Sequence, residues 1–151
     1  MRCRLHRNTQ QIWVQASASP KASKQHDVAL AVAALMTEVM RMDGKLDAAE
    51  QSHIVSKLET RFALGSAEVH RLIEQAGRET EQALDLHQFT SVVVKSFCTE
   101  ERIHILVELW QVAMADGHID PYEEQLIRRI AELLGLHHSQ FIQAKISASA
   151  G

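Results

Sequence analysis

The chain has 151 residues, a hydrophobic fraction of 46%, a charged fraction of 23% and a net charge of −3. These values are typical of one soluble globular domain. No stretch approaches the ~20 apolar residues that a membrane-spanning helix needs, and 6 Gly and 2 Pro are too few for a loop-rich fold.

Charge is distributed unevenly along the chain. Residues 1–26 hold five basic and no acidic side chains, so the remaining 125 residues carry 16 − 5 = 11 basic and 19 acidic side chains, a net of −8. An acidic body disfavours nucleic-acid binding, which needs Lys and Arg on one face. We expect 1–26 to be a basic, disordered tail and 27–148 to be the folded domain.

Helical periodicity dominates from Asp27 onward, and it predicts an all-α fold of about seven helices. The first four expected helices cover 27–42, then 47–63, then a segment capped by Ser66, then one capped by Asp85. Thr99 is expected to cap a fifth helix, which is apolar on most sides and therefore central. The sixth is expected to begin at Asp120 and the seventh after His138 or Ser139.

The chain also contains an internal repeat. Val32, Met36 and Val39 align with Ile105, Leu109 and Val112 at an offset of 73 residues, and later segments align at an offset of about 72. Each copy contains a helix, an acidic turn and a second amphipathic helix. We therefore predict two helix-turn-helix units that pack about a pseudo-twofold axis.

The repeated turns read "MDGKLDAAEQ" from Met42 and "MADGHIDPYEEQ" from Met114. Helix ends explain most of them. An Asp at each N-cap and a Glu three residues later form a capping box, and a Gly can end the preceding helix in the left-handed conformation. The expected caps are Asp47 with Glu50 and Asp120 with Glu123.

Asp43 and Asp116 do not fit this scheme, because each lies at the C-terminal end of a helix, where the macrodipole disfavours an anion. One interpretation is a cation site, since Ca²⁺ and Mg²⁺ prefer carboxylate and carbonyl oxygens. The other is a carboxylate that folds back onto the next helix. An EF-hand is not expected, because Val39, Arg41, Val112 and Met114 stand at its leading ligand positions.

Other chemistry is weakly indicated. The sequence holds no HExxH, CxxC, GxSxG or P-loop motif, and no nucleophile with a base at a recognisable spacing. We therefore expect no enzyme activity. Of the two cysteines, Cys98 lies in an apolar helix, and we expect a free thiol in a reducing cytosol.

The doubled "DGKLDAAE" and "DGHIDPYE" turns, joined through "DLHQFT" and "EERIHILVELWQVA", resemble the TerB-like tellurite-resistance proteins. The domain is also similar to the N-terminal region of DjlA co-chaperones. The resemblance covers about 27–147. It implies a cytoplasmic helical module linked to tellurite and chemical stress.

The resemblance also implies a divalent-cation site, Ca²⁺ or Mg²⁺, at Asp43, Asp47, Glu50, Asp116, Asp120 and Glu123. It further implies action through protein partners, including membrane-associated stress-response proteins. The alternative is a purely structural interaction domain without metal, in which the acids serve as helix caps. The sequence leaves the oligomeric state open.

Overall fold

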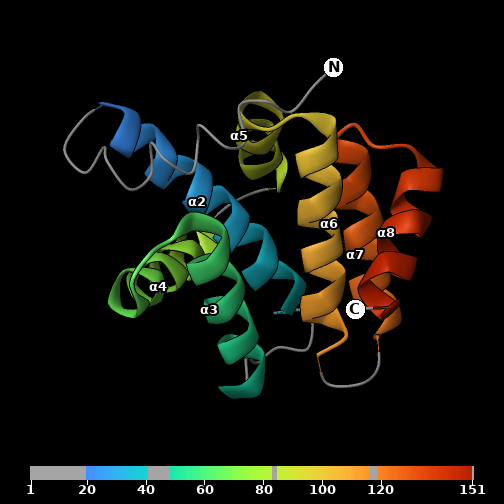
Figure 1. Cartoon of the computed structure of the whole chain (residues 1–151), viewed down its shortest axis with the longest axis horizontal. Helices are drawn as coiled ribbons and strands as arrows, with labels where there is room; N and C mark the ends of the chain where they lie inside the picture. Colours follow the sequence, from blue (N-terminus) through green and yellow to red (C-terminus); the bar gives the residue numbers. More distant parts are fainter. Residues whose placement is uncertain (1–19, 41–47, 83–84, 116–118, 151) are drawn as a thin grey trace.

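The computed structural model describes residues 20–40, 48–82, 85–115 and 119–150, without the side chains of 20–24 and 48–50. These residues form seven α-helices and no strand (Figure 1). In chain order the helices are α2 (Pro20–Met40), α3 (Ala48–Phe62), α4 (Ser66–Gln82), α5 (His87–Ser96), α6 (Thr99–Ala113), α7 (Pro121–Leu133) and α8 (His138–Ala150). The predicted all-α class is confirmed.

The first helix begins at Pro20, seven residues before the expected start at Asp27. Proline suits the first turn of a helix, because its missing N–H would be unpaired there. The proposed division into a tail and a domain remains a prediction. Among the described helices, none combines the length and the apolarity needed to cross a lipid bilayer.

Helix α2 lies at the centre of the molecule. It packs against α3, α4, α5, α6 and α7, and every side chain from Val28 to Thr37 is buried. This ten-residue stretch contains no charge, and four of its members are alanines that let neighbouring helices approach closely. The sequence pointed to the helix after Thr99 as the central one. That helix, α6, is also largely buried, but α2 is enclosed on more sides.

The predicted repeat is visible in the helix bounds. The first helix of each copy ends at Met40 or Ala113, and the second begins at Ala48 or Pro121, an offset of 73 residues in both cases. The third helices begin at Ser66 and His138, 72 apart. Packing repeats too, because α2 packs most extensively on α4 and α6 packs most extensively on α8. Helix α5 joins the copies and packs on α2 and α7.

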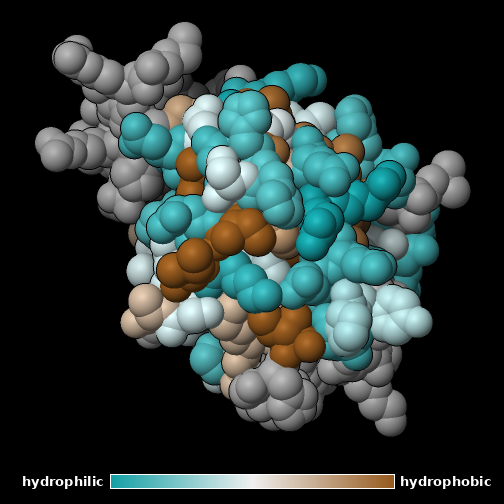
Figure 2. Space-filling view, turned by 90° about the vertical axis from the view of Figure 1, so that its right-hand side faces the viewer, coloured by the Kyte–Doolittle hydropathy of each residue, from teal (hydrophilic) through white to brown (hydrophobic). Residues whose placement is uncertain are grey.

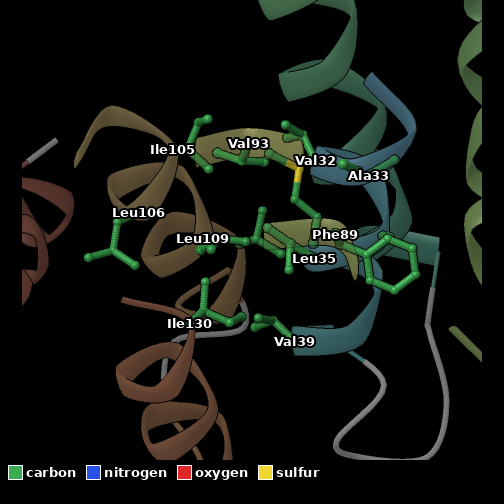
Figure 3. Close-up of a cluster of buried hydrophobic side chains, with 14 of the residues drawn as sticks. Val32, Ala33, Leu35, Val39, Phe89, Val93, Ile105, Leu106, Leu109 and Ile130 are labelled. Carbon is green, nitrogen blue, oxygen red and sulfur yellow. The ribbon is translucent and has the colours of Figure 1, made fainter. Parts of the chain in front are cut away.

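The two copies share one hydrophobic core. Figure 3 shows Leu35 and Val39 of α2 directed toward Leu109 of α6 and Ile130 of α7, with Phe89 of α5 alongside. Leu35, Val39, Leu109 and Ile130 are fully buried. At roughly 1.5–3 kcal/mol for each buried aliphatic side chain, this contact is a large share of the stability of the fold.

Matching left-handed residues end the second helix of each copy. Ala63 has φ 53° and Gly135 has φ 74°, and the two positions are 72 residues apart. At Gly135 the chain forms a Schellman motif, in which Gly135 N–H donates to Glu132 C=O and Leu136 N–H donates to Ala131 C=O. A left-handed backbone is free of strain for Gly but costs an alanine roughly 1–2 kcal/mol. The first copy therefore carries strain that the second lacks.

Arg102 secures the same corner in the second copy. Its Nη1 donates to the carbonyl of Leu134 at 2.8 Å, and its Nε donates to the carbonyl of Phe97 at 3.1 Å. Both carbonyls lie at C-terminal helix ends, where a cation is favourable. One side chain near the start of α6 therefore joins the ends of α5 and α7.

The two pseudo-equivalent contacts between the copies differ in chemistry. Where α3 meets α6, Arg61 Nε donates to Glu108 Oε1 at 2.6 Å, and Lys57 donates to Gln111. Both members of the Arg61–Glu108 pair are nearly buried, with side chains 7% and 12% exposed. Where α7 meets α2, Ile130 faces Val39 instead (Figure 3). One contact is an ion pair and its counterpart is hydrophobic.

Three local predictions need correction. Thr99 is the first residue of α6 rather than its cap, because the extended backbone residue before it is Cys98. Cys98 is disulfide-bonded, so the expected free thiol is wrong, and the partner cysteine lies outside the described residues. Asp85 is not the N-cap of α5 either, because Leu86 holds that position, although the Asp85 carboxylate accepts a hydrogen bond from His87 N–H at 2.8 Å.

The left-handed corners predict opposite effects of two exchanges. We expect Gly135→Ala to lower the free energy of unfolding by about 1–2 kcal/mol, and Ala63→Gly to raise it by about 0.5–1 kcal/mol. Gly65→Ala is the control, because an added Cβ there meets nothing within 4 Å and the backbone is not left-handed. Chemical denaturation measures all three, and destabilisation by Ala63→Gly would contradict the assignment of strain.

The nearly buried ion pair predicts strong coupling. Glu108→Leu removes the carboxylate to which Arg61 Nε donates and leaves the guanidinium with His104 as its contact, so we expect a loss of about 3 kcal/mol. The double replacement Arg61→Met/Glu108→Leu removes both charges and should cost clearly less than the two single changes summed. Denaturation of the four proteins gives the coupling energy, and simple additivity would show that the pair is not coupled.

Candidate functional site

The acidic turn of the second copy is described from Ile119 onward, and it forms the predicted capping box. The Oδ1 atom of Asp120 accepts from Tyr122 N–H at 2.9 Å, and the backbone N–H of Asp120 donates to Glu123 Oε1 at 3.1 Å. The Asp120 side chain also accepts from the backbone of Glu123, and Pro121 is the first helical residue. The predicted role of these two acids in starting α7 is confirmed.

The first copy is described less completely at this turn. Helix α3 begins at Ala48, which corresponds to Pro121 in the second copy. Glu50 belongs to the first turn of α3 by its backbone, but its side chain lies outside the described residues, as do Asp43, Asp47 and Asp116. Within the described part of the chain, no three His, Cys, Asp or Glu side chains are grouped as metal ligands. The six-residue cation site therefore remains a prediction.

The described half of the site restricts what it can do chemically. Glu123 is 4% exposed, and Asp120 is half-buried, so both carboxylates are held by the backbone rather than free in solvent. A carboxylate has about four lone-pair sites and can serve as a cap while it also binds a cation. The capping box is therefore compatible with a metal site. It also explains the positions of both carboxylates without a metal.

A second cluster lies between α6, α7 and α8. The ring of Trp110 packs against that of Phe141, with centroids 5.3 Å apart, and Lys145 Nζ lies 5.3 Å from the Trp110 ring centroid. Lys145 also donates to Glu124 of α7 at 3.0 Å. Trp110 is fully buried, so this cluster holds α8 in place and presents no aromatic surface to a ligand.

Sequence reasoning missed the polar residues that join helices. A signal for Glu108 existed, because it interrupts the run of apolar residues in a helix apolar on most sides. A charge at such a position predicts a buried partner, although not that the partner is Arg61. Arg102 offered no such signal, since one of the two carbonyls it binds belongs to Leu134, which is 32 residues away in sequence.

Comparison with solved structures finds a protein with a similar fold. A crystal structure of a protein of unknown function from Porphyromonas gingivalis W83 is similar, with a TM-score of 0.60 and 19% sequence identity. The similarity covers 82% of this chain and 89% of that chain. At this identity the likeness shows a shared fold. A comparison with curated proteins finds no match.

Comparison with family models gives a more specific result. The model described as "Tellurite resistance protein TerB" matches residues 29–146. This match runs from the buried part of α2 into α8 and includes both acidic turns. The resemblance seen in the sequence is therefore confirmed, and the chain belongs to the TerB family.

Proposed function

We propose that the protein is a non-enzymatic, cytoplasmic helical module that binds a divalent cation, Ca²⁺ or Mg²⁺, at its doubled acidic corners. It would act through protein partners, including membrane-associated ones, in resistance to tellurite and chemical stress. The observation that carries this proposal is the doubled corner itself, which recurs at one offset in a chain of the TerB family.

The arrangement of the helices supports bringing the two corners together. Helices α2 and α6 pack on each other, and both run toward the same end of the molecule (Figure 1). The chain leaves α2 at Met40 and re-enters α3 at Ala48, and it leaves α6 at Ala113 and re-enters α7 at Pro121. Both acidic segments therefore connect helices at this end.

Helix dipoles favour a cation at this end. The last turns of α2 and α6 contain no basic side chain. The partial negative charge at each terminus is thus uncompensated within its own helix, as it also is in α4, α7 and α8, whereas α3 and α5 have Arg61 and Lys95 in their last turns. Asp43 and Asp116 follow these two ends in the sequence. A hard cation would reverse an unfavourable juxtaposition of anions with helix C-termini.

A purely structural interaction domain is the second candidate, and the capping box at α7 favours it. The hydrogen bonds of Asp120 and Glu123 explain these two acids without any metal. In that case the family fold would provide a surface for partners, and the acidic turns would only start helices.

The cytoplasmic location is also part of the proposal. The match to the TerB family supports this location, whereas the disulfide at Cys98 counts against a reducing compartment. The acidic body, with its net of −8, supports protein partners over nucleic acid.

Calorimetric titration with Ca²⁺ and Mg²⁺ tests the cation site. The parent protein should release or absorb heat and gain thermal stability with one of the ions. The double variant Asp43→Asn/Asp116→Asn should lose both effects, because it removes the two carboxylates that lie outside the expected capping boxes. A parent protein that shows neither heat nor a thermal shift would reject the site.

Asp120→Ala tests the structural role separately. Loss of the N-cap should lower the free energy of unfolding by about 1 kcal/mol in metal-free buffer. Asp120→Asn is the matched control, because its side-chain oxygen still accepts from the helix N–H groups. If the acids are caps only, the effect of Asp120→Ala will be the same with and without divalent ions.

A further inference from the structure

We propose that the outer face of α8 is a self-association surface, through which two copies of this chain pair with their α8 helices antiparallel. This face consists of Ser139, Ile142, Gln143, Ile146, Ser147 and Ala150, and it is called the α8 strip below. All six residues are exposed. The proposal is independent of the cation site.

The α8 strip exposes more apolar surface than its surroundings. Ile142 is 39% exposed and Ile146 is 55% exposed, one helical turn apart on the same side. Figure 2, which faces the side of the molecule that carries α7 and α8, shows hydrophobic side chains at the surface among hydrophilic ones. Neighbouring exposed apolar side chains mark a candidate interaction surface, whereas singly scattered ones are ordinary.

The first copy supplies an internal comparison. At an offset of 72 residues, Ile142, Gln143, Ile146 and Ala150 correspond to His70, Arg71, Glu74 and Arg78 of α4. These α4 residues are also exposed, while the inward positions match, since Val69 and Ala76 are buried like Phe141 and Ala148. The fold therefore does not require an uncharged outer face, and that property belongs to α8 alone of the pair.

Charge favours a second copy as the occupant. The only charged residue of α8 is Lys145, which does not belong to the strip and whose amino group pairs at the surface with Glu124 of α7, 5.3 Å from the Trp110 ring centroid. Two strips can therefore meet without opposing like charges. Helix α8 also has no acidic residue in its first turn and no basic residue in its last. An antiparallel neighbour places the two uncompensated helix ends beside ends of opposite sign.

The extent of the strip sets the strength of the dimer. A 13-residue helix is roughly 20 Å long. A pair of such helices buries less than the ~1,200 Å² of a stable interface. The contact would therefore be weak and reversible, with monomer and dimer in exchange.

Sedimentation equilibrium of the full chain tests this inference between about 10 µM and about 1 mM, the range of weak association. The average mass should rise with concentration from 17.0 kDa toward twice that value. Ile142→Glu and Ile146→Glu should each keep the protein monomeric throughout. His70→Glu, at the corresponding position of α4, should associate like the parent.

Circular dichroism checks that each variant is folded. We expect all three to fold, because the substituted positions are exposed. A parent protein that stays monomeric at the highest concentration would overturn the proposal. So would association that persists in Ile142→Glu, or that His70→Glu abolishes equally.

Discussion

The enclosure of α2 is the constraint on which the rest of the structure depends. Ten consecutive residues of this helix, Val28 to Thr37, are buried, so no side of it can face water. A helix of this kind is stable only when others surround it. Helices of both repeats do so, with α3 and α4 from its own copy and α6 and α7 from the other. The repeat is thus a means of covering one apolar helix.

The two copies share a plan and differ in detail at several matched positions. Their contacts are an ion pair where α3 meets α6 and a hydrophobic pair where α7 meets α2. Thr37 and Trp110 correspond at the offset of 73, and each has a buried polar atom without a hydrogen-bond partner among the described residues. Such atoms cost roughly 1–3 kcal/mol each. The symmetry therefore governs the backbone and the order of the helices, while side chains at matched positions differ in chemistry.

Much of this fold could be predicted because its signals are local. Apolar periodicity located the helices, and the acid pair Asp120 and Glu123 marked the start of α7 correctly, since a cap depends on neighbours within three residues. The central helix was harder to identify. The run from Val28 to Thr37 holds no charge, yet the helix after Thr99 was the one expected to be central. Contacts of Arg61 and Arg102 depend on tertiary geometry, which no local pattern encodes. The six-acid cation site stays a prediction, because Asp43, Asp47 and Asp116 lie outside the described residues.

The position of α2 in the chain has a consequence for folding during synthesis. The most apolar helix, α2, is translated before every other described helix. Helix α6, which covers it from the second repeat, ends at Ala113, 73 residues after the end of α2 at Met40. At roughly 5–20 residues per second, that interval lasts about 4–15 s. The nascent chain therefore carries an incompletely covered apolar helix for seconds on the ribosome. Helices α3 and α4 are translated after α2 but before α6, and they would provide its early cover.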